Sequence, residues 1–220
     1  MNLNQEISKL LEKEGCKIFG FADLSILPKE PRKGFDIGIV MGAIYTTEGM
    51  RENLDGNIQK FGSDSWATCE HLERFQKTVI KFIKENGYKA NTKYVTTAIT
   101  YKMLGTLAGL GWIGKCAVLT TKKYGPALRL TSVLTNAPLE CGTPITKSLC
   151  PESCTACADI CHVNAIKGGL WEQGIHRDTF FDAKACRRGR RERDSKNTGE
   201  PTCGLCISAC PLTKKGLGYK

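Results

Sequence analysis

Apolar residues recur at helical spacing in two stretches of the first half of the chain. In residues 2–15, Ile7, Leu10 and Leu11 share one helical face, and Gly15 supplies the stop. In residues 69–86 the apolar positions again follow a helical period, at Leu72, Phe75, Val79 and Phe82. The Asn86-Gly87 pair ends this second pattern, so we expect a helix in each stretch.

Other apolar runs have the length and composition of strands. Residues 17–24 (KIFGFADL) predict a short strand, and residues 35–45 (FDIGIVMGAIY) predict a buried one. Residues 117–121 and 127–135 are also strand-like, and the KKYGP turn separates them. The first part of the chain therefore reads as a mixed α/β domain.

The character of the sequence changes near residues 138–146, a stretch with turn-forming proline and glycine. Nine of the twelve cysteines lie between Cys141 and Cys210. Residues 150–220 show little apolar periodicity, so this part needs a metal to supply folding energy. We expect an α/β domain over residues 1–140 and a metal-binding domain over residues 141–220.

Composition and charge narrow the class of protein. The chain of 220 residues contains no apolar run of about 18 residues and starts with a charged helix, so we expect a cytoplasmic protein without a membrane span. Twelve cysteines in such a protein favour metal ligation over disulfides. The net charge of +10 favours acidic or polyanionic partners.

The cysteine spacing is typical of a bacterial two-cluster ferredoxin, in which the last cysteine of each motif ligates the other cluster. The chain has C-x3-C-x2-C-x3-C from Cys150 to Cys161 and C-x2-C-x3-C-P from Cys203 to Pro211, with Cys186 between them. Exchange of the last cysteines gives two complete ligand sets for two [4Fe–4S] clusters. The first set is Cys150, Cys154, Cys157 and Cys210, and the second is Cys161, Cys186, Cys203 and Cys206.

Two alternatives stay open at this point. A pair of four-cysteine zinc sites would normally show two C-x2-C knuckles separated by a longer loop, which fits the spacing poorly. Cys141 could replace Cys150 as a ligand. We interpret Cys16, Cys69 and Cys116 as small buried side chains.

A glycine-rich segment, residues 107–115 (LAGLGWIGK), precedes the cysteines. Together with YGPALRLTSVLTNAPL and the double cysteine cluster, it resembles the epoxyqueuosine reductase family and, more distantly, the reductive dehalogenases. The resemblance covers roughly residues 98–212. It implies an α+β fold in which a nitroreductase-like α/β domain holding cobalamin precedes a ferredoxin-like double [4Fe–4S] module.

The resemblance also implies the residues that contact the cofactor. They are Gly109, Leu110, Gly111, Trp112, Ile113, Gly114, Lys115, Tyr124, Gly125, Arg129 and Thr131. From the residues alone, glycines allow a close backbone approach, and Lys115 could meet a phosphate. The alternative is a tight strand connection with Trp112 in the core, which we would favour without the resemblance. Flavin could take the place of cobalamin.

The chain departs from the family's reductase pattern before the glycine-rich segment. Val95 and Tyr101 stand where the family carries an acidic residue and a glutamate. Valine cannot do acid–base work. Tyr101, Tyr94 and Lys102 are the remaining candidates for a proton-donating site, although a tyrosine packed on a helix is the more ordinary interpretation. The helical-repeat extension of the family is also not expected here, so we expect a related reductase rather than epoxyqueuosine reduction itself.

Residues 184–196 (KACRRGRRERDSK) carry seven basic and two acidic side chains. This run is typical of a solvated loop, of a docking site for an acidic flavodoxin-like or ferredoxin-like electron donor, or of a nucleic-acid contact. We favour the protein donor over nucleic acid.

Three functions remain. The first is a corrinoid-dependent reductase whose two clusters supply electrons. The second is a ferredoxin-type electron carrier without corrinoid. The third is a basic RNA-binding protein with a structural metal. The glycine-rich segment and the strand after it favour the first, the missing carboxylate favours the second, and the cysteine spacing disfavours the third. We expect the first, and its substrate stays open.

Overall fold

The computed structural model describes residues 2–32, 34–92, 99–194 and 202–220. The chain forms two compact units, each built from stretches far apart in sequence. Unit 1 comprises residues 1–44, 68–111 and 129–145, and unit 2 comprises residues 45–67, 112–128 and 146–220. The predicted division into consecutive domains at residue 140 stays a prediction.

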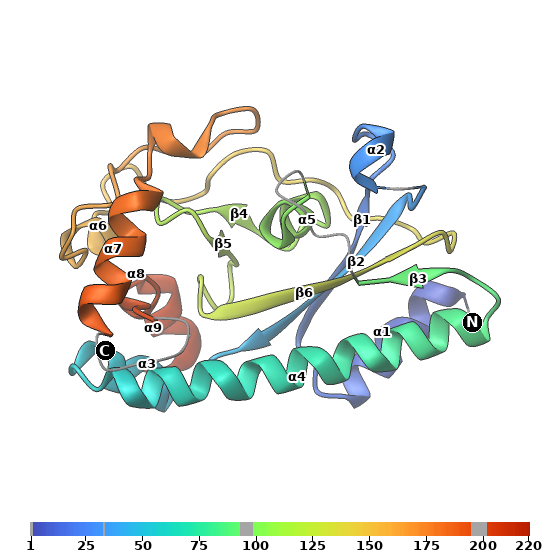
Figure 1. Ribbon diagram of the computed structural model, residues 1–220, viewed down its shortest axis with the longest axis horizontal. Coiled ribbons are helices and arrows are strands. Elements are labelled where there is room, and N and C mark those ends of the chain that lie inside the picture. Colours follow the sequence, from blue (N-terminus) through green and yellow to red (C-terminus); the bar gives the residue numbers. More distant parts are fainter. Residues whose placement is uncertain (1, 33, 93–98, 195–201) are drawn as a thin grey trace. The chain divides into compact units, whose positions relative to one another are not determined.

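Unit 1 contains the larger sheet and the helices that cover it (Figure 1). Its elements are α1 (Leu3–Lys13), β1 (Ile18–Asp23), α2 (Lys29–Arg32), β2 (Ile37–Ile44), most of α4 (Ile58–Glu85), β3 (Ala90–Asn91), α5 (Tyr101–Leu107) and nearly all of β6 (Leu128–Thr135).

Unit 2 consists mostly of short elements and loops. Its elements are α3 (Thr47–Leu54), the first turns of α4, β4 (Trp112–Ile113), β5 (Leu119–Thr120), α6 (Ala156–Asp159), the 3₁₀ helix η1 (Arg177–Thr179), α7 (Ala183–Arg193), α8 (Leu205–Ser208) and α9 (Pro211–Leu217).

The four-stranded sheet has the strand order β1-β2-β6-β3. Strands β1 and β2 are antiparallel, with Phe19 opposite Met41 and Phe21 opposite Ile39. Strand β3 is antiparallel to β6, and in unit 2 the strands β4 and β5 form a separate two-stranded ribbon. The sheet therefore has a central pair of eight-residue strands, β2 and β6, with β1 and β3 on their outer sides.

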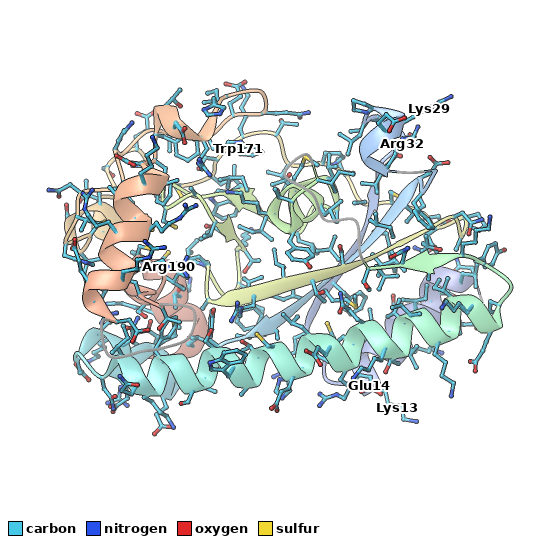
Figure 2. The ribbon with its side chains drawn as sticks, viewed as in Figure 1. Lys13, Glu14, Lys29, Arg32, Trp171 and Arg190 are labelled. Carbon is cyan, nitrogen blue, oxygen red and sulfur yellow. The ribbon has the colours of Figure 1, made fainter. Side chains whose placement is uncertain are left out.

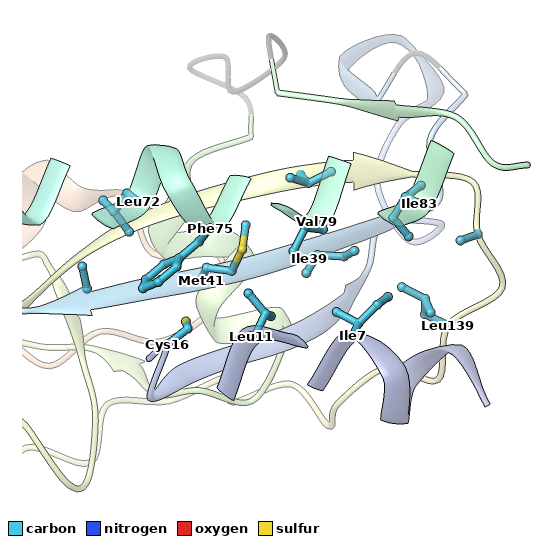
Figure 3. Close-up of a cluster of buried hydrophobic side chains, with 13 residues drawn as sticks. Ile7, Leu11, Cys16, Ile39, Met41, Leu72, Phe75, Val79, Ile83 and Leu139 are labelled. Carbon is cyan, nitrogen blue, oxygen red and sulfur yellow. The ribbon is translucent and has the colours of Figure 1, made fainter. Parts of the chain in front are cut away.

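One face of the sheet packs against α1 and α4, as Figure 3 shows. Ile39 and Met41 of β2 point to this face because alternate residues of a strand share a side. They meet Leu11 of α1 and Phe75 and Val79 of α4, each at most 2% exposed. The apolar positions that predicted the two helices are therefore the positions that pack against β2.

The opposite face packs against α5. Val40, between Ile39 and Met41 in sequence, joins Leu134 of β6 and Leu104 of α5 in a second apolar cluster. Because β2 is covered on both faces, it reads as a continuous apolar run, as expected for a buried strand.

Two details differ from the sequence-based expectations. Helix α4 begins at Ile58, well before residue 69, and its fourth core position is Ile83 rather than the half-buried Phe82. The strand expected at residues 117–121 is limited to Leu119–Thr120, which pairs with β4. Pattern reading located the elements but not their ends or their partners.

Unit 2 has a smaller apolar cluster, formed by Tyr45, Met50, Phe61, Ala127 and Tyr219. Around it, polar bonds tie the short helices together. Within the part of the chain that the structure describes, no helix is both long enough and apolar enough to cross a bilayer. The architecture is mixed α and β, as expected; its nitroreductase-like and ferredoxin-like character stays a prediction.

Candidate iron–sulfur site

The eight predicted cluster ligands all lie in unit 2, and each is a free, half-buried cysteine. Two similar motifs carry six of them. In the first, a cysteine precedes, lies within and follows the short helix α6; in the second, the same holds for α8. Gly204 allows the second motif to turn, because its φ of +65° is left-handed and a Cβ there would lie 2.3 Å from the Phe61 ring.

The first ligand set comes together around Cys210. Burial raises the pKa of the Cys210 thiol, and the charges of Cys150 and Cys157 raise it further, which places these three sulfurs in one neighbourhood. Backbone N–H groups of Thr213 and Leu212, in the first turn of α9, oppose the rise by bonding to Cys210. Thiols arranged in this way fit an anionic, thiolate-ligated group.

The second set comes together around Cys186, on the first turns of α7. Burial raises the pKa of its thiol, and the nearby charges of Cys203 and Cys161 raise it further. The sulfur of Cys161 also accepts a bond of 3.3 Å from the N–H of Ala165. Cys186 therefore neighbours two of the three other cysteines that the exchange of last cysteines assigns to its set.

The neighbours of Cys141 and Cys150 bear on which of the two is a ligand. Cys141 belongs to unit 1, where burial and then the charge of Asp23 raise the pKa of its thiol. Cys150 belongs to unit 2, where it neighbours Cys210 and accepts a bond of 3.3 Å from the Trp112 indole N–H. These contacts favour Cys150.

Within the described ranges, no three Cys, His, Asp or Glu side chains converge closely enough to hold a single metal ion. The donor chemistry nevertheless fits iron–sulfur clusters. Six of the eight unpaired cysteines fall into two neighbourhoods of three, and backbone N–H groups bond to sulfurs in both of them.

Two glycines of the glycine-rich segment lie in close contact with other residues of their own unit. A Cβ on Gly114 would lie 2.5 Å from the Thr120 hydroxyl and 3.7 Å from the Cys150 sulfur. A Cβ on Gly109, whose φ is +71°, would lie 2.6 Å from the Thr143 carbonyl. At these two positions, the glycines are required by packing within their own unit.

Lys115 and Trp112 are both engaged by the first cysteine motif. Lys115 is 4% exposed, and its ammonium donates bonds of 2.8 Å to the carbonyls of Glu152 and Cys154. Trp112, also 4% exposed, donates to Cys150. The β4–β5 hairpin therefore holds the loop of the first ligand set.

The other predicted cofactor residues lie in both units. Gly109, Leu110, Gly111, Arg129 and Thr131 belong to unit 1, and Ile113, Gly114, Tyr124 and Gly125 belong to unit 2 with Trp112 and Lys115. Contact of these residues with a corrinoid stays a prediction.

The predicted catalytic pair lies at the start of α5. Tyr101 and Lys102 follow the N-cap Thr100, and both are half-buried. Tyr94 and Val95 lie outside the described residues. A catalytic role for Tyr101 or Lys102 stays a prediction.

Helix α7 has two different faces. Lys184, Arg187 and Arg191 are exposed and fall on one side of the helix at 3.6-residue periodicity. Cys186 and Arg193 lie on the opposite side of the helix. Figure 2 shows this helix with Arg190 labelled. The basic run of the sequence is therefore divided between a solvent-facing stripe and groups used within unit 2.

Arg193 is a residue whose role the sequence did not reveal. Its guanidinium donates to the Asn53 side-chain oxygen at 2.6 Å, to the Asn53 carbonyl at 2.7 Å and to the Cys203 carbonyl. Asn53 in turn donates to Ser208 at the end of α8. This network joins α3, α7 and α8 around the second ligand set. Within an arginine-rich run, no sequence signal distinguishes Arg193 from its neighbours.

Cys116 is a second residue whose surroundings the sequence did not reveal. It is buried, as expected, at 6% exposure. Its thiol also interacts with the thiols of Cys157 and Cys206, which belong to different predicted ligand sets.

Comparisons with known proteins agree with this chemistry. No family model matches the chain. It is 30% identical over 185 residues to the epoxyqueuosine reductase of Prochlorococcus marinus, covering 81% of this chain and 58% of that protein. It is 26% identical over 222 aligned positions to that of Lactococcus garvieae, covering 94% and 61%. The chain thus spans between about half and three fifths of the curated relatives that it first matches.

Solved structures share the fold. An epoxyqueuosine reductase with an epoxyqueuosine-modified tRNA-Tyr stem loop has a TM-score of 0.61 at 19% identity, covering 96% of this chain and 65% of that one. A reductive dehalogenase, whose structure suggests a mechanism for B12-dependent dehalogenation, has a TM-score of 0.71 at 19% identity, covering 94% and 31%. The resemblance to both groups of reductases, indicated by the motifs, is confirmed.

Proposed function

We propose that this chain, a relative of the epoxyqueuosine reductases, is an iron–sulfur reductase that holds two [4Fe–4S] clusters and works with a corrinoid. The observation that carries the proposal is the grouping of the cysteines. Cys210 neighbours Cys150 and Cys157, although it follows Cys206 in sequence, and Cys186 neighbours Cys161 and Cys203. This exchange of the last cysteines is the ligand pattern of two-cluster ferredoxins.

In this proposal, the chain's own residues hold and shield the clusters. Trp112 and Lys115 fix the loop of the first set from the β4–β5 hairpin, and Arg193 fixes the second set through Cys203 and Asn53. Half-burial of the cysteines limits the access of water, which affects a cluster's reduction potential.

The corrinoid part of the proposal is supported by the relatives, which include a B12-dependent dehalogenase, and by the glycine-rich segment. A bound corrinoid would supply the reductive chemistry at its cobalt, and the protein would supply its binding and orientation. Residues 109–115 with Tyr124, Gly125, Arg129 and Thr131 would hold it, and Tyr101 with Lys102 would deliver a proton. The substrate would be a small molecule or a modified nucleoside.

Elemental analysis tests this function directly. Protein purified without oxygen from cells supplied with cobalamin is assayed for iron, sulfide and cobalt per chain. We expect about eight irons, about eight sulfides and about one cobalt. About eight irons without cobalt, and no corrinoid uptake on addition, would point to a ferredoxin-type electron carrier. Zinc in place of iron would contradict both the reductase and the electron carrier.

The exposed face of α7 favours an acidic electron donor as partner. Lys184, Arg187 and Arg191 form a basic stripe on the helix whose opposite side carries the predicted ligand Cys186. Complementary charge accelerates the encounter of such partners and makes it depend on ionic strength.

The partner is tested with an Arg187→Glu/Arg191→Glu variant. It should slow reduction of the clusters by an acidic flavodoxin at low salt, and the difference should shrink at high salt. A structural relative carries a tRNA stem loop. If the variant instead loses salt-sensitive tRNA binding at an unchanged rate of reduction, the stripe serves nucleic acid.

A further inference from the structure

Arg193 is the last residue of α7, and unit 2 holds its guanidinium in one position. The guanidinium donates to the Asn53 side-chain oxygen at 2.6 Å, to the Asn53 carbonyl at 2.7 Å and to the Cys203 carbonyl. Asn53 is fully buried, and a planar fork of donors suits several acceptors at once. The place of the positive charge is therefore set by the fold.

This fixed charge lies beside a predicted cluster ligand. The Nη1 atom of Arg193 is 4.0 Å from the Cys203 sulfur. Both hydrogens of Nη1 already go to oxygens, those of the Asn53 side chain and the Cys203 carbonyl, so the sulfur is influenced mainly by the charge. Two charges at this distance in a half-buried site interact several times more strongly than in bulk water.

The first ligand set has a different kind of group at a sulfur. Cys150 accepts a bond of 3.3 Å from the indole N–H of Trp112, which is neutral. Lys115 brings a positive charge to the same loop, and its ammonium donates to two backbone carbonyls. The group at the Cys150 sulfur is thus neutral, whereas the group at the Cys203 sulfur is a cation.

A fixed cation near a ligand sulfur has a definite effect on redox chemistry. An added electron makes a thiolate-ligated cluster more negative, so the cation stabilises the reduced state and raises the reduction potential. The guanidinium does not lose its proton in proteins, so this effect is constant with pH. Asp194, the next residue, carries the opposite charge, and its carboxylate accepts from the N–H and the hydroxyl of Thr202. A substitution of Arg193 removes the positive share alone.

We propose that Arg193 is a positioning residue that raises the reduction potential of the cluster held by the second ligand set. Its charge acts through the Cys203 sulfur, and Asn53 sets the distance between them. The cluster of the first set is left nearly unchanged. This inference rests on the proposed pair of [4Fe–4S] clusters.

The test is a redox titration of the anaerobic holoprotein, followed by electron paramagnetic resonance, with Cys186→Ser used to assign the signals of the second cluster. We expect Arg193→Gln, which removes the charge, to keep about eight irons and to lower the midpoint potential of the second cluster alone. Arg193→Lys, which keeps the charge, should stay near the wild-type potential. Arg188→Gln removes the same charge from an exposed position of the same helix, and at high ionic strength it should change neither potential.

Asn53→Asp makes the same change by a second route, without removing Arg193. The new carboxylate keeps the side-chain oxygen that accepts from the guanidinium and neutralises its charge. The potential of the second cluster should fall, as in Arg193→Gln. This variant decides the question where Arg193→Gln loses iron.

Several outcomes would overturn the inference. One is an unchanged second-cluster potential in Arg193→Gln, or in Asn53→Asp where Arg193→Gln has lost iron. Another is an equal shift of both clusters. A fall in Arg193→Lys as large as in Arg193→Gln would show that the bonds of Arg193 matter and its charge does not. A wild-type protein without iron would instead overturn the proposed function itself, so the two failures are distinguishable.

Discussion

The two units of this protein are stabilised in different ways. Unit 1 has a four-stranded sheet with apolar side chains on both faces, and its largest core residues are fully buried. Unit 2 places eight half-buried cysteines on short helices and loops, joined by polar bonds such as those of Lys115 and Arg193. Unit 1 can obtain its stability from apolar burial, whereas we expect unit 2 to gain much of its stability when its predicted ligands bind a metal group.

Removal of iron should have the largest effect and should separate the two units. After chelation under reducing conditions, we expect the cluster cysteines of unit 2 to alkylate and its amides to exchange at least about 100-fold faster, the equivalent of about 2.7 kcal/mol. Mass spectrometry of the labelled protein measures both effects.

Cys16 of unit 1 is the internal control for this experiment. Burial raises the pKa of its thiol to about 11, so at pH 8 about one thiol in a thousand is ionised and alkylation stays slow. Fast labelling of Cys16 after iron removal would mean that unit 1 also depends on the clusters.

A core substitution in unit 1 should destabilise unit 1 and leave the clusters of unit 2 unaffected. Leu11 of α1 is fully buried against the sheet, so Leu11→Ala should lower the free energy of unfolding of unit 1 by about 2–5 kcal/mol. Urea unfolding followed by circular dichroism measures the loss, and cluster absorbance below the transition should not change. Ile26→Ala, at a position 59% exposed, should change stability by less than about 0.5 kcal/mol.

Arg193→Ala should weaken unit 2 through its polar network. It leaves the buried Asn53 and the Cys203 carbonyl without their donor, a loss of about 2–3 kcal/mol. The expected result is faster loss of iron to a chelator, measured by absorbance. Arg191→Ala, at an exposed position of the same helix, is the matched control, and equal rates in the two variants would show that the Arg193 bonds do not hold the second set.

Trp112→Phe should have the smallest effect, and it tests one bond. The phenyl ring keeps most of the buried apolar area but cannot donate to the Cys150 sulfur, so we expect a loss of about 0.5–1.5 kcal/mol. In a redox titration, only the cluster of the first set should shift to a lower potential. Equal shifts in both clusters would argue against the assignment of Cys150 to one set.

Much of unit 1 could be predicted from the sequence because its signals are local. Leu72, Phe75 and Val79 predicted a buried helical face, and the run at residues 35–45 predicted a strand covered on both sides. The register of β1 against β2, and the choice of Ile83 over Phe82, depend on side chains that are distant in sequence. A periodic pattern carries no information about them.

For the candidate site, the sequence by itself determined which cysteines are available as donors. Their number and spacing predict two thiolate sets, because three close cysteines can wrap one cluster while the next points away. Only the tertiary structure decided what surrounds them. It brought Cys150 to Cys210, directed Trp112 and Lys115 to the first motif, and selected Arg193 from an arginine run. These contacts join residues many positions apart, and their geometry arises only when the chain has folded.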